Sequence, residues 1–272
     1  MRLRFVGLLI GAFVFLFPFY YMLIGSLQAE PDPTVAGAFP EPGNLTLHNY
    51  GEIDKAINLG RSLVNSGIFT GGVILGTLVF GVLAGYALAR LQFRGRGLVF
   101  NLMLLIQVVP FQLLTIPLYV LIVRSYGLAD SYGGMILPFL INSTAVFVFR
   151  QYFLQLPAEL FDAARIDGAS ELSILWRIAV PLVKPALLTG VLLTFIGPWN
   201  EFLWPFLITK QQDLQPLAVS LSNYLTTVSA RAANPFGAVL AGACVLAAPA
   251  VALFLIFQRR FISANISSGV KG

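Results

Sequence analysis

The chain alternates between long apolar runs and short polar connections. A helix needs roughly 20 predominantly apolar residues to cross the hydrocarbon core of a bilayer. The runs that reach this length are 5–27, 64–89, 98–123, 134–154, 183–208 and 237–257. The pattern therefore predicts an all-α integral membrane protein in which six transmembrane helices form one domain over residues 1–272.

Composition supports this class. Apolar residues make up 57% of the chain and charged residues only 11%, whereas soluble proteins carry about 25% charged residues. Cys244 is the single cysteine and lies in an apolar run, so an internal disulfide and a thiolate metal site are excluded. The single histidine, His48, lies in a polar loop with no second ligand nearby. It is interpreted as a solvated loop residue.

The first apolar run follows Met-Arg-Leu-Arg at the start of the sequence. A cleaved signal peptide is one interpretation, but its apolar region spans only about 7–15 residues. The length of the run favours an uncleaved membrane anchor.

Basic residues are distributed unequally between the polar connections. One set of connections carries 12 of the 17 Lys and Arg residues: Arg2, Arg4, Arg90, Arg94, Arg96, Arg150, Arg165, Arg177, Lys184, Arg259, Arg260 and Lys271. Cytoplasmic loops of membrane proteins are enriched in Lys and Arg, so both termini and residues 150–184 are predicted to be cytoplasmic. These basic residues are spread over short loops, a distribution that does not favour nucleic-acid binding.

The apolar runs contain closely spaced glycines and several prolines. Gly67/Gly71, Gly72/Gly76 and Gly81/Gly85 are spaced so that helix backbones can approach closely. Such contacts form either within the chain or at a subunit interface, and the sequence leaves both open. Seven prolines that fall inside the runs are Pro18, Pro110, Pro117, Pro138, Pro198, Pro205 and Pro249. They free backbone groups and favour a bundle that changes shape.

A polar, charged segment at 157–181 separates two apolar runs. Pro157 suits the first turn of a helix, and Gly168 suits its end. Ser170 is a candidate cap for a second helix running to Val180. We interpret this segment as a docking element for a partner that supplies energy from outside the membrane.

The spacing Asp162-Ala163-Ala164-x3-Gly168-x9-Ile178-x-Val180-Pro181 resembles the EAA loop of bacterial ABC-importer permeases. The whole chain is similar to the carbohydrate-uptake branch, the group of the smaller maltose-transporter permease. Further stretches that carry the resemblance are Asn65-Ser66, Tyr86–Arg96, Ile166–Ala169, Trp199–Phe202 and Gly269–Gly272. Asp162 replaces the usual Glu and Val180 the usual Leu. The first departure leaves open whether Asp162 alone, or Glu159 too, makes an ionic contact.

The resemblance implies a permease subunit of an ATP-driven importer for a sugar or sugar-derived solute, working by alternating access in the bacterial inner membrane. The implied partners are a second permease, two copies of an ATPase subunit and an extracytoplasmic solute-binding protein, which the loop at 209–236 would contact. The resemblance favours a different chain as the second permease, but the sequence leaves open a second copy of this one. The implied coupling residues are Glu159, Asp162, Ala163, Ala164, Asp167, Gly168 and Pro181. Gly269, Val270, Lys271 and Gly272 would contact the ATPase, or form a disordered end.

None of the four lysines, Lys55, Lys184, Lys210 and Lys271, precedes a Ser or Thr, so the chain has no P-loop. It is expected to be no enzyme and to bind no cofactor, with ATP and Mg²⁺ held by the partner ATPase.

Glu201 is the one ionisable residue clearly inside an apolar run, and such residues are usually functional. Trp199, Asn200, Glu201, Gln107, Gln112 and Asn142 are the candidates for a substrate pathway. Alternatively, the tryptophans form an interfacial belt and the polar groups join helices. The apolar runs hold no deep cation, which favours a neutral solute. An ion-driven transporter would need carboxylates in several spans, and a membrane enzyme would need a catalytic cluster. The sequence shows neither.

Overall fold

The computed structural model describes residues 2–228 and 235–269, and the side chains of residues 4–228 and 235–258. Secondary structure in these residues is helical apart from an isolated β-bridge between Gln28 and Leu45. The predicted all-α fold is confirmed.

The α-helices are α1 (Arg2–Ser26), α2 (His48–Ile57), α3 (Leu59–Arg90), α4 (Arg96–Ile106), α5 (Phe111–Tyr119), α6 (Tyr132–Ile136), α7 (Ser143–Gln155), α8 (Ala158–Ile166), α9 (Glu171–Ile174), α10 (Val180–Leu182), α11 (Lys184–Asn200), α12 (Leu203–Ile208), α13 (Leu217–Asn223) and α14 (Pro235–Gly269). Short 3-10 helices are η1 (Val35–Ala38), η2 (Pro42–Asn44), η4 (Leu137–Phe139) and η6 (Gln212–Leu214). π-Helical turns are η3 (Val120–Ser125), η5 (Leu175–Ala179) and η7 (Tyr224–Val228).

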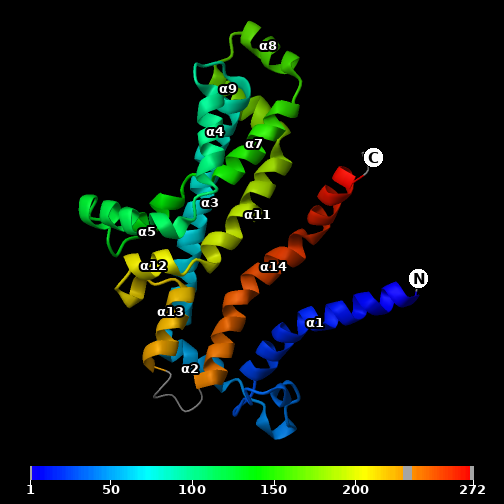
Figure 1. Cartoon of the computed structure of the whole chain (residues 1–272), viewed down its shortest axis with the longest axis vertical. Helices are drawn as coiled ribbons and strands as arrows, with labels where there is room; N and C mark the ends of the chain where they lie inside the picture. The colour runs from blue at the N-terminus through cyan, green and yellow to red at the C-terminus, as the bar shows by residue number, and fades with distance from the viewer. Residues whose placement is uncertain (1, 229–234, 270–272) are drawn as a thin grey trace. The chain divides into compact units, whose positions relative to one another are not determined.

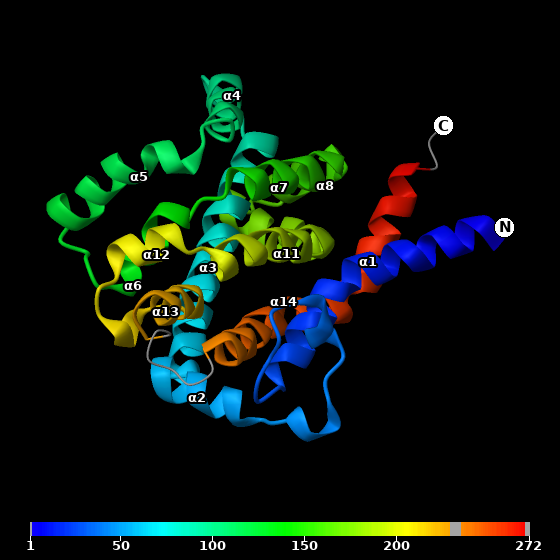
Figure 2. The ribbon, with the colours of Figure 1, turned by 60° about the horizontal axis from the view of Figure 1, so that its bottom comes forward.

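Among the described residues, three helical stretches are long and apolar enough to cross a membrane unbroken: Arg4–Ser26, Leu59–Arg90 and Pro235–Gln258. Three further spans are available only as bent pairs, with bends of 98° after Ile106, 49° after Phe139 and 82° after Leu182. The predicted spans 98–123 and 134–154 are therefore interrupted helices. The 82° bend precedes the predicted span 183–208, which is itself broken between α11 and α12. The count of six spans stays a prediction. Figures 1 and 2 show α5 turning away from the direction of α4.

Prolines account for the interruptions. Pro110 has no N–H, so the carbonyl of Ile106 loses its helical donor and α4 ends there. Pro185 stands at the start of α11, directly after the 82° bend. Pro138 likewise removes the donor for the Gly134 carbonyl, which instead accepts a hydrogen bond from the Trp204 indole at 3.1 Å. The breaks thus follow from the prolines, whereas their angles depend on what each helix packs against.

The chain divides into two compact units, residues 1–63 with 216–272 and residues 64–215. In the first unit, α14 contacts α1, α2 and α13. Its core contains Ile53, Leu217 and Tyr224, all nearly fully buried. Asn49 is also buried and donates hydrogen bonds to the carbonyls of Ser26 and Gln28, which fixes the start of the connection between α1 and α2.

In the second unit, α7 packs against α3 and α11 through one aromatic ring. Phe149 on α7 is fully buried. A Cβ atom on Gly85 of α3 would lie 2.8 Å from the Cβ of Phe149, and one on Gly190 of α11 would lie 2.4 Å from its ring. These two glycines therefore allow the three helices to close around the ring. The contacts of Gly81 and Gly85 assign this small-residue pair to packing within the chain.

Candidate docking helix and membrane cavity

Helix α8 lies at one end of the second unit (Figure 1) and has sharply defined ends. Pro157 directly precedes its first residue with extended backbone, ψ 136°. At its other end the N–H groups of Gly168 and Ala169 donate to the carbonyls of Arg165 and Ala164, at 3.0 and 2.9 Å. This is the Schellman pattern, and it requires the left-handed conformation that Gly168 adopts, φ +79°. The helix predicted between Pro157 and Gly168 is present.

The segment after Gly168 differs in part from the prediction. Ser170 caps the next helix as expected, with its Oγ accepting a hydrogen bond from the N–H of Ser173 at 3.3 Å. Helical structure then runs without a gap from Glu171 to Leu182, as predicted for a helix reaching Val180, but it includes the π-turn η5 between α9 and α10. Leu175 and Ala179 are buried in this turn, so its geometry serves packing against the core.

Phe161, which is 1% exposed, packs one face of α8 against the core of the second unit. The Phe161 ring centroid lies 6.2 Å from that of Tyr86 on α3, and the Arg90 guanidinium carbon lies 4.3 Å above the Phe161 ring. Burial of one such side chain contributes about 1.5–3 kcal/mol. Because Tyr86 and Arg90 belong to the last turns of the long helix α3, the position of α8 is tied directly to that helix.

Arg90 also closes the end of α7. Its Nε donates to the carbonyl of Phe153 at 3.0 Å, and its Nη2 reaches the carbonyls of Phe153 and Leu156. The last carbonyls of a helix lack intrahelical donors, and a cation is favoured at this end. One side chain therefore joins α3, α7 and, through Phe161, α8.

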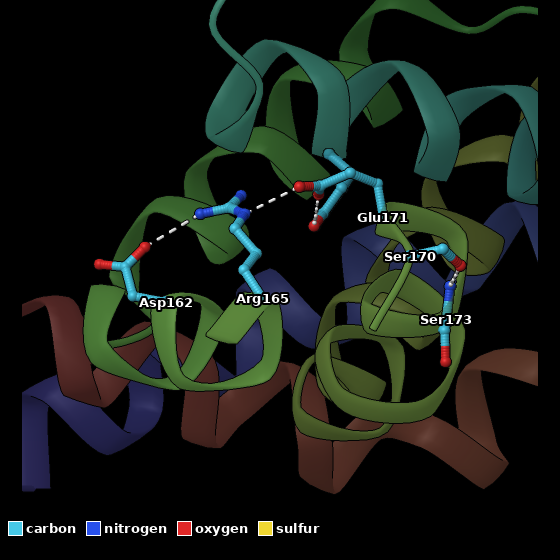
Figure 3. A network of polar contacts seen from close by, with 6 residues as sticks. Asp162, Arg165, Ser170, Glu171 and Ser173 are labelled. Carbon is cyan, nitrogen blue, oxygen red and sulfur yellow. Dashed lines mark hydrogen bonds and ion pairs between the residues drawn. The ribbon is translucent and has the colours of Figure 1, made fainter. Parts of the chain in front are cut away.

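A chain of polar contacts ties α8 to α9 and α3 (Figure 3). The Tyr86 hydroxyl donates to Glu171 Oε2 at 2.7 Å. Arg165 donates from Nε to Glu171 Oε1 at 2.8 Å and from Nη1 to Asp162 Oδ1 at 3.0 Å. The hydrogen bond from Arg165 lowers the pKa of Glu171, and the reciprocal contact raises the pKa of Arg165. Glu171 and Arg165 thus remain ionised at neutral pH.

These ion pairs contribute more to orientation than to stability. The Arg165 side chain is 37% exposed, and the Glu171 and Asp162 side chains are 41% and 65% exposed. Solvent-exposed pairs of this kind contribute about 0.2–1 kcal/mol each. The buried ring of Phe161 therefore holds α8 in place, and the polar chain fixes its rotation.

The predicted coupling residues do not all lie on the surface. Those exposed are Glu159, Asp162, Ala163, Asp167, Gly168 and Pro181. Ala164 is 7% exposed and packs in the core with Phe161, so it would act by holding the helix. Gly269 ends α14, whereas Val270, Lys271 and Gly272 lie outside the described residues.

The residues predicted for a substrate pathway separate into two groups. Glu201 and Asn142 line one cavity of about 210 Å³, which also contains Val73, Pro138, Phe139, Ile141, Thr194, Gly197 and Pro198. Gln107 and Asn142 line an adjoining cavity of about 460 Å³. Trp199, Asn200 and Gln112 line neither cavity: Trp199 stacks on Phe195, and Asn200 donates to the Ile196 carbonyl.

Polar groups at both cavities have structural contacts as well. Glu201 lies at the break between α11 and α12, where its Oε1 accepts from the N–H of Trp204 at 3.2 Å. Gln107 accepts from the Thr144 hydroxyl at 3.0 Å. Within residues 4–228 and 235–258, no group of three or more His, Cys, Asp or Glu side chains is placed to hold a metal ion.

Residues 77–264 match the family described as binding-protein-dependent transport system inner membrane component. This stretch covers more than half of the chain and includes α8 and every bent pair of helices. The chain belongs to this family. It is therefore an inner membrane component of a transport system, and the resemblance to ABC-importer permeases is confirmed. Proteins of this family are permease components and are not themselves enzymes.

Similar proteins match this permease over nearly its whole length. It is 36% identical to the arabinooligosaccharides transport system permease protein AraQ of Bacillus subtilis (strain 168), covering 95% of this chain and 92% of the relative. It is 30% identical to the sn-glycerol-3-phosphate transport system permease protein UgpE of Yersinia pestis, covering 97% and 95%. It is 34% identical to the trehalose transport system permease protein SugB of Mycobacterium tuberculosis, covering 92% and 90%.

A solved structure has the same fold as this permease. It is the crystal structure of a bacterial ABC transporter involved in the import of the acidic polysaccharide alginate, with a TM-score of 0.80 at 25% identity. The match covers 96% of this permease and 95% of that chain. The ABC-importer permease fold predicted from the sequence is thereby confirmed.

Several residues of the permease that organise the site were not predicted as such. Tyr86 is 85 positions from Glu171, and no local pattern connects them. Thr194 was not singled out because a threonine in an apolar helix usually satisfies its hydroxyl within that helix. Arg165 offered a signal, since it stands three positions from Asp162 and is placed to pair with it.

Proposed function

We propose that this permease is one of two transmembrane subunits of an ABC importer for a sugar, and that α8 is the helix through which partner ATPase subunits move it. One observation carries the proposal. Helix α8 exposes Glu159 and Asp162, and the exposed Asp167 directly follows it, while Phe161 anchors the other face of α8 to α3. A push on α8 is therefore transmitted to a helix 32 residues long.

The proposed mechanism is alternating access. Closure of two ATPase subunits on ATP displaces α8, and the displacement reaches α3 through Phe161 and α7 through Arg90. The permease and a second, different permease then rock between inward-open and outward-open states, each forming half of the pathway. The bent helices that line the two cavities favour such a change in shape.

ATP and Mg²⁺ belong to the ATPase subunits in this proposal, because the sequence of this chain contains no P-loop. Both termini and α8 lie on the cytoplasmic side, as the distribution of Lys and Arg favours. The tail Gly269–Gly272 then reaches the ATPase pair. The loop at 209–236 faces the opposite side and contacts the solute-binding protein.

The solute is proposed to be a neutral oligosaccharide. Relatives are named for arabinooligosaccharides, trehalose and sn-glycerol 3-phosphate. The cavity linings offer the Glu201 carboxylate and the amides of Asn142 and Gln107, and in the described part of the chain neither lining contains Lys or Arg. An anionic solute would meet a carboxylate without a compensating cation, so the lining favours a neutral sugar.

Reconstitution tests this proposal. The permease is assembled in liposomes with its second permease, ATPase and binding protein, and uptake of arabinotriose, trehalose and sn-glycerol 3-phosphate is measured with and without ATP. We expect ATP-dependent uptake of a neutral sugar that requires the binding protein. Uptake that is independent of ATP and driven by a sodium or proton gradient would contradict the proposal.

A further inference from the structure

The last turns of α11 line the smaller cavity. Thr194, Gly197 and Pro198 line this cavity from one face of α11, as their spacing of i, i+3 and i+4 predicts, and Glu201 lines it from the residue directly after the helix. Asn142, at the start of α7, lines the same cavity. Two broken helices thus present polar groups to one space.

Thr194 differs from an ordinary buried threonine. It is 1% exposed, and in the described part of the chain its Oγ1 has no hydrogen-bond partner. A buried hydroxyl without a partner is costly, and nearly all such groups in proteins are satisfied. Pro198 also removes the donor that position i+4 would give the Thr194 carbonyl. The hydroxyl of this residue therefore favours an occupant that hydrogen-bonds.

The neighbouring groups define the chemistry of that occupant. Asn142 Oδ1 already accepts from the N–H of Ala145, which leaves its amide nitrogen as the donor. One carboxylate oxygen of Glu201 accepts from the N–H of Trp204, which leaves the other as an acceptor. Together with the Thr194 hydroxyl, which both donates and accepts, these groups complement adjacent hydroxyls of a sugar.

We propose that the cavity formed by Asn142, Thr194 and Glu201 is a binding subsite for a neutral polyhydroxylated solute, and that Thr194 is one of its ligand-contacting residues. The cavity volume of about 210 Å³ exceeds what a single water needs, which is roughly 10–15 Å³ by the same kind of measure. This inference rests on the proposed sugar transport and assigns the chain a solute contact of its own.

Protection of a reporter thiol tests the subsite. Cys244 is replaced by Ala, and Ile141→Cys places the reporter on the cavity lining. The three polar residues Asn142, Thr194 and Glu201 are left unchanged. The rate of its reaction with 2-aminoethyl methanethiosulfonate is measured in the assembled importer with and without arabinotriose. We expect arabinotriose to slow the reaction and sn-glycerol 3-phosphate to have no effect.

The variant Thr194→Val, which keeps the shape and removes the hydroxyl, should raise the arabinotriose concentration for half-protection by roughly 2- to 10-fold, the range that one buried hydrogen bond contributes. Thr70→Val is the matched control, because Thr70 is also buried with an unpartnered hydroxyl but lines neither cavity.

Four results would overturn the inference: an unreactive reporter, no protection by arabinotriose, protection by sn-glycerol 3-phosphate alone, or equal effects of the two Thr→Val variants. If ATP-dependent uptake nevertheless persists in the same liposomes, the importer assignment stands and only the subsite fails.

Discussion

Arg165 and Glu171 belong to different helices, and their side chains meet at 2.8 Å across the turn that ends α8. The same carboxylate accepts the Tyr86 hydroxyl of α3 at 2.7 Å. The Glu171 carboxylate, on α9, therefore connects the proposed docking helix α8 with the long helix α3. This relationship makes the orientation of α8 testable separately from its attachment through Phe161.

Reversing the charges of this pair tests its role in coupling. Arg165→Glu or Glu171→Arg alone places like charges opposite each other and should lower the uptake of solute per ATP hydrolysed. The double variant restores opposite charges and should recover part of the ratio. Its recovery will be incomplete because an arginine at position 171 cannot accept the Tyr86 hydroxyl. If the loss of uptake per ATP in the double variant equals the sum of the losses in the two single variants, the pair does not set the orientation of α8.

The pair also predicts a pH dependence of stability. The pKa of Glu171 in the folded protein is lowered from its ordinary value of 4.5, first by the hydrogen bond from Arg165 and further by that from Tyr86, although partial burial opposes this. A carboxyl group with a lowered pKa stabilises the fold above the unfolded pKa and loses that contribution as the pH falls through the folded pKa.

We therefore expect the difference in Tm between the wild type and Glu171→Gln to be constant from pH 8 down to about pH 5 and to shrink below about pH 4. Thermal unfolding in detergent over this range measures it. A difference that grows on acidification would contradict the sign of the shift. Glu159→Gln provides a control, since Glu159 is exposed on the neighbouring helix α8 and forms no ion pair within the described residues.

Gly168 predicts a graded response to substitution. Its φ of +79° is accessible to Asn at small cost but is strained for residues with a branched Cβ. Gly168→Ala should cost about 1–2 kcal/mol, Gly168→Asn less and Gly168→Val more, with uptake per ATP falling in the same order. No neighbouring atom lies within 4 Å of a Cβ built at this position, so the effect is one of backbone conformation. Normal uptake with normal ATPase stimulation in Gly168→Val would contradict the proposal that α8 is the helix on which the ATPase subunits act.

Local signals predicted α8 better than they predicted the spans. Pro157, Gly168 and Ser170 each act within a few residues, and each stands where the structure begins or ends a helix. The bends at Pro110 and Pro185 depend on tertiary packing, because a proline within a membrane helix can bend it slightly or break it. Pro18, for example, lies inside the uninterrupted helix α1.

The parts of the site that sequence reasoning missed are those that join distant segments. The contact between Tyr86 and Glu171 and the cavity shared by Asn142 and Thr194 bring together residues more than 50 positions apart. A threonine in an apolar run has no distinguishing pattern until its surroundings are known. Glu201 was found because a carboxylate in such a run is rare.

The glycine pocket around Phe149 predicts which small residues are structural. Gly85→Ala would bring a methyl group to 2.8 Å from Phe149 Cβ and 3.1 Å from the backbone nitrogen of Arg150, and overpacking of this kind costs about 1–3 kcal/mol. Gly71→Ala, on the same helix, meets no atom within 4 Å and should leave the Tm unchanged or slightly raised. Equal Tm values for both variants in detergent would show that α7 moves away without cost.

The contacts of Asn65 predict how the connection between α12 and α13, residues 209–215, is held. Its side chain is fully buried. Its Nδ2 donates to the carbonyls of Asp213 and Gln215 at 2.8 and 3.0 Å, and its Oδ1 accepts a hydrogen bond from the Tyr132 hydroxyl at 2.6 Å.

Asn65→Ala removes all of these contacts and should cost about 1–3 kcal/mol for each buried group left unsatisfied. The connection would then open more often, and trypsin should cleave after the exposed Lys210 faster than in the wild type. Tyr132→Phe, which removes only one contact, should accelerate cleavage less. Unchanged cleavage in Asn65→Ala would mean that the connection is held instead by Asp130, whose carboxylate accepts the backbone N–H groups of Lys210 and Gln211 at 2.6 and 3.0 Å.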